Sequence, residues 1–336
     1  MATLFTCIFL AARLASVQEV KEKQKSFDPY CPGGMEAYLK TIGYGGLRDV
    51  TTDTLKALQA AHARTIPLEN LGFMCGEKVL HCPLAVCRRI VLGGRGGASP
   101  ELNGAYCWLL QQLGFQATLV ACELYNHQSS SFLPEGSHIA VLVGLGRKRF
   151  LTDISCPTFS KEPMVIVPHK VQTDAVGSRH RLRRHDEMTW SFQKMFFTRF
   201  EGPLFEECDI APDPNPPWTT VYRFSLIPIV LEDFKHLTNV FYQNFKSPKG
   251  EKLFSPTKDP LVMRHTTRGR KFLLGKRFCT VVYKEGVARK TVTDIDTSEE
   301  MADVIWREFG IRMVDEKQLM PRIDLLYDQK VRRSSI

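Results

Sequence analysis

The apolar residues of this chain change their spacing at Gly114, and this change limits the folds that the chain can adopt. Between residues 102 and 113 the apolar positions recur at helical intervals and end at Gly114. Beyond Gly114 the pattern becomes alternating or continuously apolar, which predicts strands. The predicted strands in this region are 117–125, 139–143 and 149–154. A helical first third, a strand-rich middle and a mixed final third predict an α+β fold.

The composition is that of an ordinary globular protein. The 336 residues are 43% hydrophobic and 24% charged, enough for two or three domains and a sizeable core. The net charge of +9 favours an anionic partner, and nucleic acid, an acidic membrane and a phosphorylated small molecule all fit that charge.

The ten cysteines contain no CxxC pair, so we expect no zinc site and no other metal. Reduced, mostly buried thiols in a cytoplasmic protein are the simplest expectation. No run of eighteen apolar residues is present, so we expect no membrane span. Residues 4–12 form a short apolar run that resembles a signal-peptide core, but no basic residue precedes it. We favour a disordered extension over residues 1–28.

The segment 95–104 is a candidate nucleophile site. Two glycines follow Arg95, which predicts a tight turn or a close approach of the backbone. Pro100 and Glu101 are typical of the first turn of a helix, so Ser99 lies at or just before a helix N-terminus. Ser99 can be an ordinary N-cap, or it can be a nucleophile whose developing charge the helix N-terminus stabilises.

A base and an orienting carboxylate follow at the expected kind of position. His138 lies 39 residues after Ser99, at the start of the strand 139–143, and Asp153 ends the next strand. A tight turn at 144–147 can bring the two residues side by side, which predicts an acyl-transfer triad. Taken singly, the histidine can be a core or surface residue and the aspartate a turn residue.

Longer motifs around these residues occur in a recognisable order. The nucleophile segment reads RGGASPELNGAYCWLLQQLGF, and IPLENLGFMCGE precedes it. SHIAVLV, FLTDI and VYRFSLIPIVLEDFKHLTNVFYQNFKSP follow. From about residue 29 to residue 313 the chain resembles the arylamine N-acetyltransferases.

The resemblance implies a three-part fold with a catalytic core like that of the cysteine proteases. Its parts are an N-terminal helical bundle (29–115), a central β-barrel-like domain (116–217), and a C-terminal α/β lid with the tail (218–336). It also implies the reaction: acetyl-coenzyme A (acetyl-CoA) acylates the nucleophile, and an arylamine or hydrazine then takes the acetyl group. The co-substrate is acetyl-CoA, no metal is needed, and no nucleic acid is expected as a partner.

The resemblance assigns roles to individual residues as well. The implied catalytic residues are Ser99, His138 and Asp153. The implied coenzyme-binding residues are Gly136, Ser137, Ser255 and Thr257, and Cys156 is implied to bind the acceptor.

Two departures from the family pattern concern the chemistry. Ser99 stands where the family has its nucleophilic cysteine, and a hydroxyl is much harder to deprotonate than a thiol. Cys107 cannot replace it, because eight helical residues separate the two by about 12 Å. The family continues Asp-x-Gly-Phe-Gly, whereas residues 153–157 here read Asp-Ile-Ser-Cys-Pro.

Three functional hypotheses therefore remain. The protein is an active acyltransferase that uses Ser99, a silent relative that still binds CoA or a partner, or a papain-like or transglutaminase-like hydrolase. The basic runs 179–185, 268–271 and 276–277 are either solvated segments or sites for the phosphates of CoA.

Overall fold

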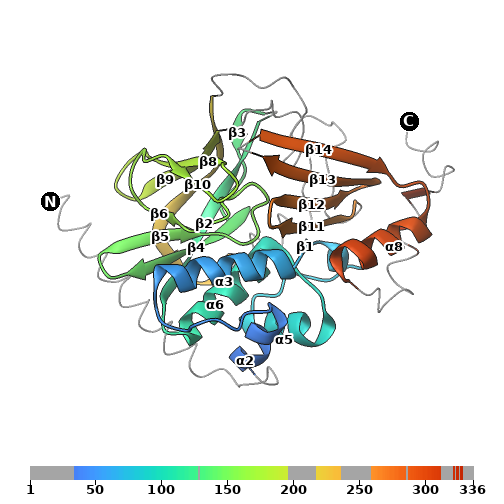
Figure 1. Ribbon diagram of the computed structural model, residues 1–336, viewed down its shortest axis with the longest axis horizontal. Coiled ribbons are helices and arrows are strands. Elements are labelled where there is room, and N and C mark those ends of the chain that lie inside the picture. The colour runs from blue at the N-terminus through green and yellow to red at the C-terminus, as the bar shows by residue number, and fades with distance from the viewer. Residues whose placement is uncertain are drawn as a thin grey trace.

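The computed structural model describes residues 34–127, 129–195, 217–235, 259–284, 287–311, 321, 323–324 and 326–327. The predicted extension 1–28 and the predicted coenzyme residues Ser255 and Thr257 lie outside these residues. Figure 1 shows a helical lobe below two sheets that stand side by side, with the larger sheet on the left and the smaller on the right.

The helical lobe is organised around one buried helix. It consists of α2 (Gly34–Thr41), α3 (Thr52–Thr65), α4 (Leu71–Met74), α5 (Pro83–Gly93) and α6 (Ser99–Gln112). Leu102, Tyr106 and Leu109 of α6 are fully buried in a core shared with α2, α3 and α5. The predicted helix thus forms where its apolar spacing placed it. The N-cap of α3 is Thr51, whose hydroxyl accepts from the Thr54 N–H.

The larger sheet has nine strands and is nearly closed. In spatial order it runs β6-β5-β4-β2-β10-β9-β8-β7, and β3 pairs with β2. A parallel bridge links Pro168, which follows the edge strand β6, to Leu182 of β8, next to the other edge, and the His169 N–H donates to the Leu182 carbonyl at 2.7 Å. The strands are β2 (Gln116–Asn126), β3 (Ser131–Phe132), β4 (His138–Leu145), β5 (Lys148–Thr152), β6 (Met164–Val165), β7 (Gln172–Thr173), β8 (Arg179–Arg184), β9 (Thr189–Met195) and β10 (Trp218–Ile229).

Strand β10 corrects the predicted boundary at residue 217. That boundary places Trp218–Ile229 in the lid, but β10 lies between β2 and β9 in the nine-stranded sheet. Tyr222 and Phe224 of β10 are buried in the core of that sheet. The prolines at 212–217 therefore precede a strand of the barrel-like sheet and do not mark the start of the lid.

The smaller sheet joins a short piece of the helical segment to the C-terminal strands. Its order is β1 (Leu68–Glu69), β11 (Leu261–Thr266), β12 (Gly269–Leu274), β13 (Arg277–Lys284) and β14 (Val287–Asp294). Helix α8 (Ser298–Phe309) buries Met301 and Ile305 against this sheet. Thr297 caps α8, and Gly310 ends it in a left-handed conformation. Strand β11 was not predicted. After β10, Leu231–Phe234 form a single 3₁₀ turn.

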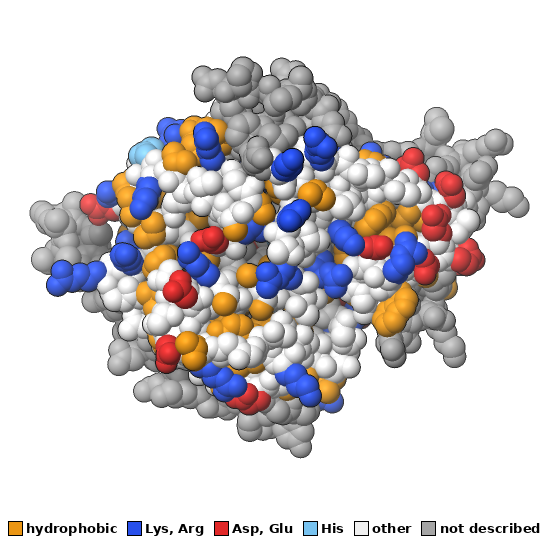
Figure 2. Space-filling view, viewed as in Figure 1, with side chains coloured by type: hydrophobic (Ala, Val, Ile, Leu, Met, Phe, Trp, Pro, Cys, Tyr) orange, Lys and Arg blue, Asp and Glu red, His pale blue; other side chains and the backbone are white. Residues whose placement is uncertain are grey.

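The basic run 179–185 forms strand β8 and its end. His180 and Leu182 point into the core, whereas Arg179, Arg183 and Arg184 are exposed. This alternation is what a half-buried strand requires, so the run fits the solvated interpretation. Figure 2 shows Lys and Arg side chains spread over one face of the molecule rather than gathered at one point, with acidic side chains near α8. Phosphate binding by the basic runs stays a prediction.

Candidate active site

Helix α6 begins at Ser99, and the serine is not its N-cap. The N-cap is Ala98, whose N–H donates to the Glu101 carboxylate at 2.7 Å. Glu101 thus accepts the hydrogen bond from the N-cap N–H, as the glutamate of a capping box does. The Ser99 hydroxyl, in the first turn, takes no part in this capping.

Glu101 is a buried anchor for the segment that carries Ser99. Its side chain is 1% exposed, accepts from the Leu80 N–H at 2.8 Å, and forms an ion pair with Arg89 at 2.7 Å. Burial would lower the pKa of Arg89, but the negative charge of Glu101 raises it above its ordinary value. A Cβ on Gly97 would lie 2.4 Å from the Arg89 guanidinium and 2.6 Å from the Glu101 carboxylate. The second glycine of the motif therefore makes room for this ion pair.

The first glycine of the motif lets two backbones meet. A Cβ on Gly96 would lie 1.8 Å from the carbonyl oxygen of Pro67, so only glycine fits there. Next to it, Arg95 makes two hydrogen bonds to Glu69, at 2.9 and 3.0 Å. Glu69 also accepts from the Leu71 N–H at 2.8 Å. The segments that begin at Ile66 and Arg95 are thus joined into one unit by the hydrogen bonds of Glu69.

Asn70 connects that structure to the smaller sheet. Its amide donates to the Asp259 carbonyl at 2.8 Å, and its oxygen accepts from the Leu261 N–H at 2.7 Å. Together with the backbone pairing of β1 and β11, Asn70 therefore ties the segment that contacts Arg95 and Gly96 to the smaller sheet.

Ser99, His138 and Asp153 form a continuous hydrogen-bonded chain. Ser99 Oγ lies 2.7 Å from His138 Nδ1, and His138 Nε2 lies 2.6 Å from Asp153 Oδ2. The three residues are 2–5% exposed, and the Tyr222 ring packs against the imidazole with its centroid 5.2 Å away. The β4–β5 hairpin places the base and the carboxylate side by side, as the sequence predicts. The three residues that the sequence spacing singled out therefore lie in contact.

Asp153 is held as a carboxylate. Burial would raise its pKa, but attraction to His138 and hydrogen bonds from His138, Asn103 and the Ser155 N–H lower it below its ordinary value. Its Oδ1 atom accepts from the N–H groups of Ser155 and Cys156 at 3.1 and 3.0 Å. An ionised Asp153 can stabilise the imidazolium that forms when His138 accepts a proton.

Asn103 organises the site and was not among the predicted site residues. It lies one turn after Ser99 on α6, and its amide nitrogen donates to Asp153 Oδ1 at 3.0 Å and to the Ile139 carbonyl at 2.5 Å. Its oxygen accepts from the Ile154 N–H at 3.2 Å. The spacing of four residues from Ser99 was the available signal, because i and i+4 share one face of a helix.

Ser155 is a second hydroxyl at the nucleophile. Its Oγ lies 2.9 Å from Ser99 Oγ and 3.2 Å from Asp153 Oδ1, and it accepts from the Asn103 amide at 2.9 Å. Ser99 and Ser155 are both departures from the family motif noted in the sequence. The structure brings these two departures into direct contact.

The other predicted site residues lie around this chain. Gly136 and Ser137 are buried just before β4: the Gly136 N–H donates to the Cys122 carbonyl at 3.2 Å, and the Ser137 hydroxyl accepts from the Leu124 N–H at 3.0 Å. Cys156 is 3% exposed and follows Ser155. The coenzyme and acceptor roles of these residues stay predictions.

The buried thiols near the site are poor nucleophiles. Burial raises the pKa of Cys107 to about 12. Burial and the nearby Asp153 charge raise the pKa of Cys156 to about 12 as well. Since the thiolate is the reactive form of cysteine, neither residue offers a substitute for the missing family cysteine.

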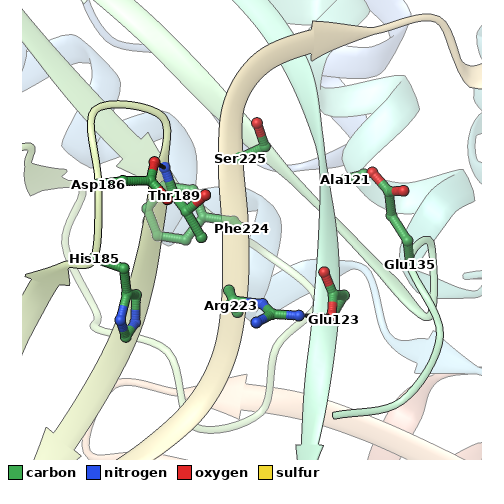
Figure 3. A pocket seen from close by; sticks show the side chains of 9 residues that line it. All are labelled: Ala121, Glu123, Glu135, His185, Asp186, Thr189, Arg223, Phe224 and Ser225. Carbon is green, nitrogen blue, oxygen red and sulfur yellow. Dashed lines mark hydrogen bonds and ion pairs between the residues drawn. The ribbon is translucent and has the colours of Figure 1, made fainter.

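A pocket of about 370 Å³ is lined mainly by residues of β2, β10 and the segment that leads into β9. Figure 3 shows that Glu123 and Arg223 meet in it, and their ion pair measures 2.5 Å. The Arg223 guanidinium also lies 4.4 Å from the centre of the Phe132 ring. Ser99, His138 and Asp153 are not among the residues that line this pocket.

Two further findings concern the described part of the chain. No helix in it is long and apolar enough to cross a membrane. No group of three or more His, Cys, Asp and Glu side chains in it is arranged to hold a metal ion.

The helical lobe, the nearly closed sheet and the hydroxyl–imidazole–carboxylate chain define an α+β protein of the acyl-transfer class. The chain belongs to the arylamine N-acetyltransferase family, since the sequence pattern of that family, described as N-acetyltransferase, matches residues 51–319.

Similar proteins agree with this assignment over most of the chain. Arylamine N-acetyltransferase 2 of Mesocricetus auratus is 25% identical over 296 residues, which cover 86% of this chain and 97% of that protein. Proansamycin X synthase of Amycolatopsis mediterranei is 29% identical over 267 residues, covering 78% and 92%. The solved structure of Mycobacterium marinum arylamine N-acetyltransferase in complex with CoA has a TM-score of 0.69 at 20% identity, covering 87% and 99%. This structure shares the fold.

Proposed function

We propose that this protein is an acetyl-CoA-dependent N-acetyltransferase that acts on arylamines or hydrazines through an acetyl–Ser99 intermediate. The observation that carries the proposal is the chain from Ser99 through His138 to Asp153, with contacts of 2.7 and 2.6 Å, in a member of this family. The CoA complex of the Mycobacterium marinum relative supports CoA as the co-substrate.

In the first half-reaction the acetyl group moves from sulfur to oxygen. His138 Nδ1 takes the proton of Ser99 Oγ while the oxygen attacks the thioester carbonyl carbon. The carbon–sulfur bond then breaks, and the CoA sulfur leaves with the proton from His138. Asp153 stabilises the transient imidazolium through Nε2.

In the second half-reaction the acceptor amine replaces the serine. The amine nitrogen attacks the ester carbonyl, His138 accepts a proton from that nitrogen, and the bond to Ser99 Oγ breaks. The oxygen recovers its proton from the imidazole. The products are the acetylated amine and the original enzyme, which is a ping-pong sequence.

The oxygen at position 99 changes the relative rates expected for the two half-reactions. Acetyl transfer from a thioester to an alcohol is downhill, so the first step is favoured in free energy. The resulting oxyester is a poorer donor than a thioester toward a weakly basic arylamine. We therefore expect the second half-reaction to be the slower one.

The proposal also covers the residues that bind the two substrates and the compartment in which the protein acts. We assign CoA contacts to Gly136 and Ser137, together with Ser255 and Thr257, and acceptor contacts to Cys156. We also place the reaction in the cytoplasm, which the seven free cysteines of the described residues support.

The test compares the native protein with Ser99→Cys and Ser99→Ala variants. Each is incubated with acetyl-CoA alone, followed by intact mass measurement, and then with acetyl-CoA and an arylamine. We expect an acetyl adduct on the native protein and none on Ser99→Ala, with turnover above that of Ser99→Ala. If the native protein matches Ser99→Ala while Ser99→Cys turns over, the native chain is a silent relative on an intact scaffold and the proposal is wrong.

A further inference from the structure

Ser155 Oγ lies in this hydrogen-bonded site, but the proposed reaction gives it no role. It is 1% exposed and touches Ser99, Asp153 and Asn103 at 2.9, 3.2 and 2.9 Å. A hydroxyl has one hydrogen to donate and can accept two hydrogen bonds. The direction in which Ser155 donates therefore determines what it does.

Counting hydrogens around Asp153 favours donation to Ser99. Asp153 Oδ1 already has three N–H donors within 3.1 Å, from Asn103, Ser155 and Cys156. Since Asp153 is ionised, His138 Nε2 carries the hydrogen between them and Nδ1 accepts the hydrogen of Ser99, which leaves the lone pairs of Ser99 Oγ open to a donor. The contact of Ser155 Oγ with Ser99 Oγ is also 0.3 Å shorter than its contact with Asp153 Oδ1.

We propose that Ser155 is a second catalytic hydroxyl that donates a hydrogen bond to Ser99 Oγ and activates it. The inference rests on the proposed function only in requiring Ser99 to be the nucleophile. As the Ser99 proton moves to His138 Nδ1 and Oγ bonds to the acyl carbon, negative charge develops on Oγ. The Ser155 O–H stabilises that charge while keeping its own proton, so the proton and electron balance of the reaction is unchanged.

This role is specific to an oxygen nucleophile. A serine must lose its proton during attack, so a donor that stabilises the developing charge lowers the barrier. A cysteine beside an imidazole is already drawn into a thiolate–imidazolium pair. The same donor then stabilises the starting state as well, and its removal has little effect on the rate. The value of Ser155 thus depends on the atom at position 99.

The test is a double-mutant cycle on the full chain. Ser155→Ala is made in the native and the Ser99→Cys backgrounds, and the release of CoA from acetyl-CoA is followed in a single turnover. The backbone at Ser155 does not have a positive φ, so alanine fits it. Ser155→Gly removes the same hydroxyl and serves if alanine disturbs folding. Ser160→Ala is the matched control, since Ser160 is 6% exposed and its hydroxyl accepts only from the Glu162 N–H in the described contacts.

A second readout does not depend on acetyl transfer. A fluorophosphonate labels activated serines, and intact mass gives its rate of reaction with Ser99. We expect Ser155→Ala to slow both labelling and CoA release about ten- to one-hundred-fold in the native background, the range of one hydrogen bond to a charged group. We expect CoA release to change by no more than about threefold in the Ser99→Cys background, and both rates to change by no more than about threefold for Ser160→Ala in the native background.

The outcomes separate this inference from the proposed function. Equal losses in both backgrounds, an unchanged labelling rate, or no labelling of Ser99 in the native protein overturn the role of Ser155. If Ser99 is labelled in a Ser155-dependent way but never acetylated, the proposed function fails and the role of Ser155 stands. If acetylation proceeds at the native rate in Ser155→Ala, the proposed function stands and this inference fails.

Discussion

Replacing Gly96 by alanine perturbs the nucleophile segment from outside the triad. The new Cβ would lie 1.8 Å from the Pro67 carbonyl oxygen and 2.8 Å from its carbon. Both atoms belong to the backbone and cannot rotate away. Real Cβ atoms do not approach other atoms closer than 3.0 Å, so the two segments must separate by more than 1 Å.

That separation breaks a defined set of contacts. The Glu69 N–H donates to the Gly97 carbonyl at 3.0 Å, and the Gly97 N–H donates to the Pro67 carbonyl at 3.4 Å. Two backbone hydrogen bonds at about 0.5–1.5 kcal/mol each give a loss of about 1–3 kcal/mol in the free energy of unfolding. Ser99 lies three residues further on, and a displacement of about 1 Å at a reacting group can cost roughly 10²-fold in rate.

The assay combines urea unfolding, followed by tryptophan fluorescence, with the rate of CoA release. Gly45→Ala is the matched control, because Gly45 has no atom within 4 Å of a built Cβ and no positive φ. Gly45→Ala is expected to leave the rate unchanged and the stability within about 1 kcal/mol of native. If Gly96→Ala behaves like Gly45→Ala in both measurements, the close approach at Pro67 does not position the nucleophile, and this account of the Arg-Gly-Gly motif is wrong.

Three further substitutions test other parts of the site. Glu101→Gln leaves Arg89 partly buried without its counter-charge, so we expect urea unfolding to show a loss of about 3 kcal/mol, against less than 1 kcal/mol for the exposed Glu232→Gln. Asp153→Asn is expected to lower acetyl transfer roughly 10³- to 10⁴-fold, measured by CoA release. Because folding lowers the pKa of Asp153, its contribution to stability is present above the unfolded pKa and is lost as the pH falls through the folded pKa. Between about pH 7 and pH 3, the urea midpoint of Asp153→Asn should therefore fall less than that of the native protein. Asn70→Ala removes two hydrogen bonds to the smaller sheet, and hydrogen exchange should show faster opening of β11 while the helices keep their protection.

The contact between Ser99, His138 and Asp153 could be predicted because each of the three lies at the start or end of a helix or strand that the local sequence indicates. Pro100 and Glu101 mark the start of α6, which fixes the place of Ser99. The apolar run of β4 and the tight turn after it fix His138 relative to Asp153. In each case the signal lies within about fifteen residues. Local periodicity and turn chemistry are the sequence signals that a single chain carries most clearly.

What could not be predicted depends on contacts between distant segments. Strand β10 lies after a proline-rich stretch, and only its pairing with β2 and β9 assigns it to the larger sheet. Strand β11 is recognisable as a strand chiefly because β1 and β12 flank it. The same holds in the site. The helical spacing from Ser99 places Asn103 on the right face of α6, but its contact with Asp153 and that of Ser155 with Ser99 span 50 and 56 residues and could not be read from spacing.

The scaffold around position 99 fixes where the nucleophile lies, and the atom at that position decides where the proton lies. The imidazole presents Nδ1 to Ser99 and Nε2 to Asp153, the reverse of the serine-protease arrangement, in which Nε2 meets the serine. That orientation is set by Asp153 and Asn103, whose bonds do not involve the nucleophile's own atom. A sulfur at this position would share its proton with the imidazole at rest, whereas the oxygen keeps it until attack. An oxygen nucleophile on this scaffold therefore needs an additional source of stabilisation at the oxygen itself, and Ser155 is the side chain that the structure places there.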